Sequence, residues 1–351
     1  MIIYQRLLNM HRLPYLAFIC FLSGILLLTG CSGDDEPSPG GDDASCKAVT
    51  LLFGPSGLGD AGYNDRILAA ASRYCLEHSR MELRYVSPDD DREAEQSFLD
   101  WLGQAESDDG DMLVLTQQSY EKIVEKHKAQ IDPQRHRIIL LDSRRSDLPV
   151  HTVYISYYGA CYWAGRLHAD TGEGMSAAII KANNRNIVLN EMEASFRHGI
   201  ADGGGEIAAT GILDDEGENG FDMAMAAYWL TAEFPITIDL IFPIAGGSNM
   251  GVYRFTREFP KTFLTVGIDV NQENYSSSIG FSLLKHTDRL IQEYLEAWIN
   301  GEGLPSGTHV VGLADGYTDL QISRYYDDYY GDSNRFKNIA IEKETEYEKT
   351  L

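Results

Sequence analysis

The chain has 351 residues, of which 44% are hydrophobic, and its formal net charge at pH 7 is −24. This length allows roughly two domains of ordinary size, and the apolar fraction is large enough for a folded core, which excludes wholesale disorder. The acidic excess excludes nucleic acid as a partner, because phosphate binding needs an extended basic track. It also disfavours charge-driven binding to an anionic membrane surface.

The first 30 residues have the organisation of an export signal. Arg6 and Arg12 form a basic start, an apolar run extends over residues 13–28, and the tripeptide Leu28-Thr29-Gly30 precedes Cys31. A basic region, an apolar stretch and small residues before a cleavage site are typical of secretory signals. The cysteine after Leu-Thr-Gly resembles the bacterial lipobox. That resemblance implies cleavage before Cys31 and a lipid on its sulfur, and a plain transmembrane anchor is the alternative.

Residues 31–46 predict a flexible acidic tether, because they are rich in Gly, Ser, Pro and Asp and carry no apolar pattern. The run Ser32-Gly33-Asp34-Asp35-Glu36 resembles the surface-export signal of Bacteroidota lipoproteins, with a solvated linker as the alternative. We therefore expect a protein of the bacterial cell envelope that is anchored to the membrane by lipid at Cys31. The outer-membrane surface is one candidate location.

The sequence offers no motif for metal or covalent chemistry. Cys46, Cys75 and Cys161 show no metal-ligand spacing. We expect free thiols, with a Cys46–Cys75 disulfide as the alternative. The sequence contains no G-x-S-x-G, no H-E-x-x-H and no P-loop. It therefore predicts a protein that is not an enzyme and needs no cofactor or metal.

From residue 47 onward, strand patterns alternate with helical patterns. We expect strands at 48–53, 81–86, 111–116, 137–141, 151–155, 176–180, 206–209, 239–244, 262–268, 309–313 and 319–322. We expect helices at 65–78, 89–105, 119–130, 159–170, 190–203, 220–234, 252–259 and 281–300. This alternation favours right-handed βαβ units and parallel sheets. The stretch after Tyr325 reads as an acidic, tyrosine-rich tail.

The pattern predicts two α/β lobes with a ligand cleft between them, since no linker divides the chain. We expect residues 47–156 plus about 270–308 in lobe 1, and residues 157–269 plus about 309–345 in lobe 2.

Polar residues recur where the expected strands end, and in parallel sheets ligands bind at those ends. Glycines in the loop after the first strand let the backbone approach a ligand closely. Carboxylates and amides at such positions can accept from hydroxyls or base N–H groups, although each one alone could equally be a helix cap or a turn residue. The strand-end candidates are Asp60, Tyr63, Asn64, Gln117, Asp142, Gly246 and Asp269.

Four short motifs, in order, resemble the basic membrane lipoprotein family, whose members bind purine nucleosides. Gly59–Asn64 (GDAGYN) is similar to the family's GDxxFN, and Ile241–Gly247 (IFPIAGG) to its strand and AAGG loop. Val266–Gln272 (VGIDVNQ) is similar to GVDxDQ, and Phe281–Lys285 (FSLLK) to TSxxK. The resemblance extends from about residue 51 to about residue 320.

This resemblance implies a type I periplasmic-binding-protein fold, in which two Rossmann-like lobes with parallel sheets enclose a ligand cleft. It implies a lipidated solute-binding protein that delivers a nucleoside-like solute to a membrane transporter. Asp269 would accept from two ribose hydroxyls, and Lys285 would donate to the sugar or to Asp269. With the strand-end residues, the expected ligand-binding set is Asp60, Tyr63, Asn64, Gln117, Asp142, Phe196, Phe221, Gly246, Asp269 and Lys285.

The motifs also depart from the family pattern. Tyr63 replaces a phenylalanine and Asn271 replaces an aspartate. Relatives of the family bind other heterocycles, including riboflavin. The alternative function is therefore a surface-exposed interaction or sensory lipoprotein on the same scaffold, with a different small ligand or none. The aromatic run Tyr325–Tyr330 supports that alternative, because aromatic clusters often mark contact surfaces.

Overall fold

The computed structural model describes residues 46–54, 57–104, 111–172, 176–305 and 307–351. The expected signal peptide, the lipidation site at Cys31 and the tether up to residue 45 lie outside the described residues. Everything below concerns the compact unit that begins at Ser45.

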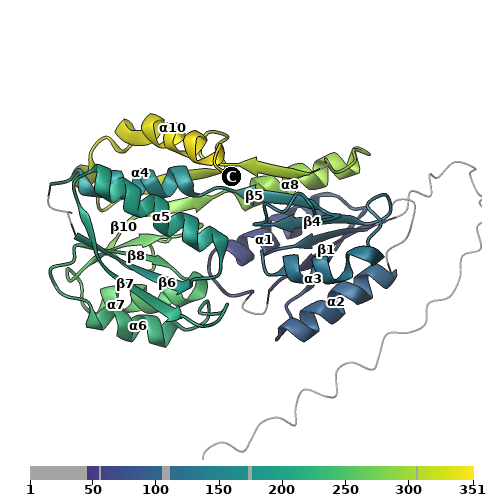
Figure 1. Cartoon of the computed structure of the whole chain (residues 1–351), viewed down its shortest axis with the longest axis horizontal. Coiled ribbons are helices and arrows are strands. Elements are labelled where there is room, and N and C mark those ends of the chain that lie inside the picture. Colours follow the sequence, from purple (N-terminus) through teal and green to yellow (C-terminus); the bar gives the residue numbers. More distant parts are fainter. Residues whose placement is uncertain (1–45, 55–56, 105–110, 173–175, 306) are drawn as a thin grey trace, which may run out of the picture. The chain divides into compact units, whose positions relative to one another are not determined.

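The first sheet consists of six parallel strands in the order β11-β5-β4-β3-β1-β2 (Figure 1). Its strands are β1 (Lys47–Leu52), β2 (Met81–Val86), β3 (Met112–Leu115), β4 (Arg137–Leu141), β5 (His151–Ile155) and β11 (Thr308–Val311). The strands β3 and β5 are buried along their whole length. This burial on both faces explains their continuous apolar runs.

The second sheet has the order β12-β10-β9-β8-β6-β7, which repeats five strands of the first sheet with each number raised by five and places β12 where the first sheet has β11. Its strands are β6 (Ser176–Asn183), β7 (Glu206–Asp214), β8 (Leu240–Ile244), β9 (Leu264–Gly267), β10 (Ile279–Lys285) and β12 (Thr318–Ile322). Only the pair of β10 with β12 is antiparallel. The predicted pair of parallel α/β lobes is confirmed.

Helices cover both faces of each sheet. Lobe 1 has α1 (Tyr63–Glu77), α2 (Asp91–Gln104), α3 (Tyr120–His127) and α8 (Thr287–Ile299). Lobe 2 has α4 (Tyr158–Ala169), α5 (Ile187–Asp202), α6 (Ala224–Glu233), α7 (Asn249–Glu258), α9 (Asp327–Tyr330) and α10 (Lys337–Glu348). The short 3-10 helices are η1 (Lys128–Gln130), η2 (Gly246–Ser248) and η3 (Ser333–Phe336). Within the described ranges, none of these helices has the length and apolarity to cross a membrane.

Each sheet divides the core of its lobe into two layers because successive strand residues point to opposite faces. In β1, Val49 and Leu51 pack with α1 and α8, while Leu52 packs with α2 and α3. In β6, Ile179 faces the α4–α5 layer, while Ile180 faces the α6–α7 layer.

Three connections join the lobes, at residues 156–157, 286 and 312–317. The expected lobe boundaries were wrong at two strands. Residues 279–285 form β10 in the second sheet rather than part of lobe 1, and residues 308–311 form β11 in the first sheet rather than part of lobe 2. Each of the last two strands completes a different sheet.

The expected helix at 281–300 was also wrong in its first part. Residues Ile279–Lys285 are a strand, and α8 begins at Thr287. A short, fully buried apolar run has no periodicity that separates strand from helix, so FSLLK was read as the start of the helix that follows. The stretch after Tyr325 is not a tail, since α10 packs against α4 on lobe 2 (Figure 1).

The two helices α4 and α5 approach each other at two glycines. A Cβ built at Gly199 would lie 2.1 Å from the backbone oxygen of Tyr162, and one at Gly165 would lie 2.4 Å from that of Phe196. Both contacts are with backbone atoms, so no side-chain movement can relieve them. The two glycines therefore set the distance between the helices.

We predict that Gly199→Ala lowers the free energy of unfolding by about 1–3 kcal/mol, because the added methyl forces two buried helices apart. The measurement is urea denaturation followed by circular dichroism. Gly103→Ala is the matched control, since a Cβ at that helical glycine meets nothing within 4 Å and alanine favours the helix by up to about 1 kcal/mol. Equal stability of wild type and Gly199→Ala would contradict the close-packing argument.

Candidate functional site

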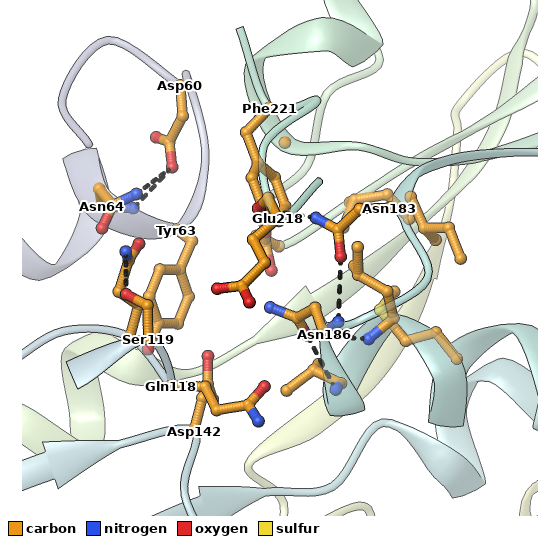
Figure 2. Close-up of a pocket in the computed structure, with 18 of the residues that line it drawn as sticks. Asp60, Tyr63, Asn64, Gln118, Ser119, Asp142, Asn183, Asn186, Glu218 and Phe221 are labelled. Atoms are coloured by element: carbon orange, nitrogen blue, oxygen red, sulfur yellow. Dashed lines mark hydrogen bonds between the residues drawn. The ribbon is translucent and has the colours of Figure 1, made fainter. Parts of the chain in front are cut away.

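A cavity of about 200 Å³ lies where the carboxyl ends of strands from both sheets meet. Figure 2 shows Asp60, Tyr63 and Asn64 on one side of it and Asn183, Asn186 and Phe221 on the other. Nine of the ten expected residues line the cavity, namely Asp60, Tyr63, Asn64, Gln117, Asp142, Phe221, Gly246, Asp269 and Lys285.

The expectation for Phe196 was wrong. Its side chain is fully buried in the core of lobe 2, where it stacks on Phe242 with the ring centroids 4.2 Å apart. Phe196 lies on the face of α5 that packs against the sheet, whereas the cavity is lined by the first turns of α5.

Asp60 lines the cavity and also caps α1. Its Oδ1 accepts from the backbone N–H of Gly62 at 2.9 Å and of Asp65 at 3.3 Å. Its Oδ2 accepts from the backbone N–H and the side-chain amide of Asn64, both at 2.9 Å (Figure 2). A carboxylate offers about four lone-pair sites. The four N–H donors at the start of α1 therefore occupy the full acceptor capacity of Asp60. Burial raises the pKa of Asp60 although these bonds lower it.

An ion pair crosses between the lobes on the wall of the cavity. Lys285, at the end of β10, donates to Oδ1 of Asp142 at 2.7 Å, and its side chain is only 2% exposed. Its Nζ also lies 4.5 Å from the ring centroid of Tyr63 and 5.3 Å from that of Tyr157, distances at which cation–π attraction contributes. Lys285 therefore pairs with Asp142 and not with Asp269. Burial, followed by the charge of Asp142, raises the pKa of Tyr63.

Asp269 is the carboxylate with capacity left for a ligand. Its Oδ1 accepts from the hydroxyl of Tyr157 at 2.5 Å, whereas its Oδ2 has no hydrogen-bond donor among the described residues. Burial raises the pKa of Asp269 to about 6, against the opposing effect of Lys285. An acceptor that is held away from water and lacks a full set of donors gains by binding a hydroxyl or N–H group.

The N-terminus of α5 also borders the cavity, and side chains already cap it. Asn186 accepts from the backbone N–H groups of Val188 and Leu189, and Gln118 from lobe 1 accepts from that of Ile187 at 3.0 Å. Asn183 holds the preceding turn through the N–H groups of Arg185 and Asn186. Because the first amides are occupied, this helix end is not an open anion site.

Charged side chains connect the lobes at the edge of the cavity. Lys122 on α3 donates to Glu218, which follows β7, and Arg185 lies 3.6 Å from the same carboxylate. These groups are substantially exposed, so the ion pairs contribute little stability by themselves.

Lobe 2 supplies aliphatic and aromatic side chains to the cavity as well as polar ones. The apolar side chains that line it come from α5, the strands and the loop before α6, and they are Val188, Leu189, Met192, Phe221, Ile244 and Ile268. Phe221 lies against Gly246, where a Cβ would approach its ring to 3.1 Å. Gly246 also has a left-handed backbone, with φ of 53°, so the space and the turn both require glycine.

Sequence reasoning missed several lining residues. Tyr157 follows the expected strand 151–155 by two residues, yet it was not among the strand-end candidates. Asn183 does end a strand, but the strand was expected to stop at Ile180. Gln118 and Lys122 lie at the start of α3 and Asn186 directly precedes α5, and none of the motifs in the sequence includes them.

The described residues contain no group of three or more His, Cys, Asp or Glu side chains arranged to hold a metal ion. Cys46, Cys75 and Cys161 are free thiols in this structure.

The chain matches no protein-family model and no curated protein sequence. It does match solved structures. The ABC-transporter solute-binding protein of Aeropyrum pernix K1 superposes with a TM-score of 0.67 at 18% identity, covering 86% of each chain. The fold is that of periplasmic solute-binding proteins.

Two further structures have the same fold. A carbohydrate transporter solute-binding protein of Agrobacterium radiobacter, solved with D-arabinose, has a TM-score of 0.62 at 13% identity over 82% of this chain and 97% of its own. A transcriptional activator of the comK gene from Bacillus halodurans has a TM-score of 0.64 at 14% identity over 84% and 97%. At these identities the similarity shows the fold alone.

We predict that Asp269→Asn stabilises the unliganded protein by about 2–3 kcal/mol at pH 7 and by little at pH 4. The folded-state pKa of about 6 lies above the ordinary value of 3.8, so folding favours the protonated acid. Wild-type stability is therefore lost as the pH rises from about 4 to about 6, and the variant lacks that loss. Asparagine also tolerates the left-handed backbone of residue 269, where φ is 69°.

The measurement is urea denaturation of both proteins at pH 4, 5, 6 and 7. Titration of other groups cancels in the difference between the two proteins. If the difference in unfolding free energy between the two proteins does not vary with pH, the pKa of Asp269 is not raised in the folded state.

Proposed function

We propose that the protein is an exported, lipidated solute-binding protein that captures a small heterocyclic solute, a purine nucleoside, in the cavity between the lobes for uptake by a membrane transporter. The observation that carries this proposal is the carboxylate of Asp269, which lines the cavity and whose Oδ2 has no donor in the described part of the chain. Vicinal hydroxyls of a ribose can supply two donors to such a carboxylate.

The division of the cavity into polar and apolar parts supports a ligand with two unlike halves. Polar groups gather around Asp269, Asp142 and Lys285, whereas α5 and Phe221 supply apolar and aromatic surface. A nucleoside has this division, with a hydroxylated ring beside a flat heterocycle that can pack against an aromatic side chain. A free sugar would leave much of the apolar part unused.

The charges of the lining favour a ligand without phosphate. Five acids, Asp60, Glu121, Asp142, Glu218 and Asp269, face three cations, Lys122, Arg185 and Lys285. Two of those cations pair with Glu218 and the third with Asp142. Since Asp60 and Asn186 already cap the starts of α1 and α5 at the cavity, a phosphate there would meet occupied amides and excess negative charge.

The N-terminal sequence supports the placement of the protein in the cell envelope. The lipobox-like Leu28-Thr29-Gly30-Cys31 and the acidic tether up to residue 46 would hold the folded unit at a membrane by one lipid-modified residue. The basic membrane lipoprotein family and its transporters are the family and partners that this proposal implies.

The alternative, a surface interaction or sensory protein without this ligand, loses part of its support. Of the tyrosines proposed as a contact surface, Tyr330 is 1% exposed and packs against Phe281 with the ring centroids 5.3 Å apart. The hydroxyl of Tyr326 donates to the backbone oxygen of Ser277 at 3.0 Å. These side chains serve to dock the C-terminal segment on lobe 2.

We expect calorimetric titration of the purified protein with inosine, guanosine, adenosine, uridine, riboflavin, D-ribose and D-arabinose to give micromolar or tighter binding for a purine nucleoside. The corresponding 5′-monophosphate should bind at least about 100-fold more weakly, because the carboxylates repel it. Preference for a free pentose would contradict the nucleoside assignment. Absence of binding to every compound in the panel would contradict the proposed class of solute.

The role of Asp269 has its own control in the same titration. Asp269→Ala should weaken binding by about 1–3 kcal/mol, the usual cost when a ligand donor loses its acceptor. Asp222→Ala should bind as wild type does, because Asp222 is exposed and lies outside the lining. Equal losses in both variants would refute a specific contact at Asp269.

We expect Cys31→Ala to shift the protein from the membrane fraction to the soluble fraction of cells that export it, because a lipid on this sulfur would be the anchor. Immunoblotting of the two fractions measures the shift. Cys46→Ala is the control, since that exposed thiol should not affect partitioning. A Cys31→Ala protein that stays in the membrane fraction would refute lipid anchoring at this residue.

A further inference from the structure

The first connection between the lobes ends in an α4 N-terminus that two buried glutamates bind. Oε1 of Glu191, on α5, accepts from the backbone N–H of Tyr157 at 2.8 Å and from the hydroxyl of Ser156 at 3.1 Å. Oε1 of Glu344, on α10, accepts from the N–H of Gly159 at 3.1 Å. Glu191 therefore fixes the connection itself, and Glu344 fixes the first turn of α4 that follows it.

Glu344 also binds the third connection. Its Oε2 accepts from the backbone N–H of Leu313 at 2.7 Å and of Ala314 at 3.3 Å. Glu344 is 1% exposed. One carboxylate thus ties the first turn of α4, which directly follows the first connection, to the third connection, with one oxygen on each.

The packing around this carboxylate leaves no space for a side chain at the two neighbouring glycines, Gly312 and Gly159. A Cβ at Gly312 would lie 2.6 Å from the carboxyl group of Glu344, and one at Gly159 would lie 3.1 Å from its carboxyl carbon. On the next turn of α10, the ring of Tyr347 stacks on Tyr158 with the centroids 4.2 Å apart. Helix α10 therefore contacts the start of α4 through two side chains, those of Glu344 and Tyr347.

The first connection leads directly to the cavity. Tyr157, whose N–H binds Glu191, donates its hydroxyl to Asp269 at 2.5 Å. A shift in the backbone of this connection moves the Tyr157 hydroxyl and with it the orientation of the Asp269 carboxylate. Glu344 and the cavity are joined through bonded or adjacent residues at every step.

We propose that Glu344 is a positioning residue for solute binding: by tying the start of α4, directly after the first connection, to the third connection, it holds the two lobes in the arrangement that directs Tyr157 and Asp269 at the ligand. The consequence for affinity rests on the solute-binding function proposed above. The tie itself is a property of the unliganded protein and can be measured without a ligand.

The same group makes the tie sensitive to pH. Burial raises the pKa of Glu344 to about 7, and Glu348 on the same helix adds to the effect, whereas the three N–H donors oppose it. Asp315, Glu191 and Arg144 are the other charged groups that act on this part of α10, through Glu348. The carboxylate accepts from three amides above pH 7, and the protonated acid gives up acceptor capacity below it. The tie is therefore weaker below pH 7.

The test compares wild type with Glu344→Gln, which keeps the size of the side chain but replaces one acceptor oxygen by a donor. Hydrogen exchange is followed at the amides of Gly159, Leu313 and Ala314 in unliganded protein at pH 6 and pH 8, as protection factors. Glu342→Gln is the control, because Glu342 is an exposed residue of the same helix. We expect Glu344→Gln to lower protection by about 5-fold or more at pH 8 and to leave little difference at pH 6, and Glu342→Gln to change neither.

The second arm measures affinity for the nucleoside that binds wild type. Glu344→Gln should weaken binding by about 2- to 30-fold at pH 8, through faster dissociation, and its affinity should vary less between pH 6 and pH 8 than that of wild type. Unchanged protection in Glu344→Gln overturns the tie. Lowered protection with unchanged affinity overturns the positioning role. If no solute of the panel binds wild type, the solute-binding proposal fails, the positioning role fails with it, and the exchange arm alone decides whether the tie exists.

Discussion

At the cavity a buried lysine, Lys285, lies near two aspartates and forms an ion pair with one of them, Asp142. The chemical character of the cavity depends on the other aspartate, Asp269. Lys285 of lobe 2 donates to Asp142 of lobe 1 at 2.7 Å, and the Tyr157 hydroxyl is the one donor to the Asp269 carboxylate within the described ranges. A buried ion pair contributes modest net stability, but loss of one partner leaves an uncompensated charge at a cost of about 3–5 kcal/mol. The pair therefore fixes how the two lobes meet more than how stable each one is. The carboxylate of Asp269 is the group that favours a ligand with hydrogen-bond donors.

The two aspartates occupy equivalent places in a repeated architecture. Asp142 follows β4 and Asp269 comes just after β9, and these strands hold the same position in sheets of identical order. Both residues have a left-handed backbone, with φ of 57° and 69°. Such a conformation costs about 1 kcal/mol or more for a residue other than glycine and persists where the surroundings enforce it. In both lobes the effect of the turn is the same, because it places a carboxylate on the wall of the cavity instead of along the edge of the sheet.

Local signals were sufficient for the order of elements, because strands buried on both faces and amphipathic helices alternate along the chain. They were sufficient for most of the site too, since the polar residues after β1, β3, β4 and β9 lie at one edge of each sheet. They failed where a contact joins distant segments. The run from Phe281 to Lys285 is apolar throughout, and only its pairing with β9 and β12 makes it a strand. The pairing of Lys285 with Asp142, 143 residues apart, and the three amides bound by Glu344 leave no local pattern. Phe196 has the composition of a site aromatic, but the orientation of its helix face buries it.

The late entry of β11 constrains how this chain can fold during synthesis. Five strands of the first sheet are complete by residue 155, yet the edge of β5 is covered only by residues 308–311, after almost all of the second lobe. Closing so long a loop is entropically costly and slow. Until it closes, β5 exposes a row of unpaired amides and carbonyls that can template pairing with another chain. A nascent chain is therefore vulnerable to aggregation at that edge until residue 311 has emerged and β11 can pair with β5.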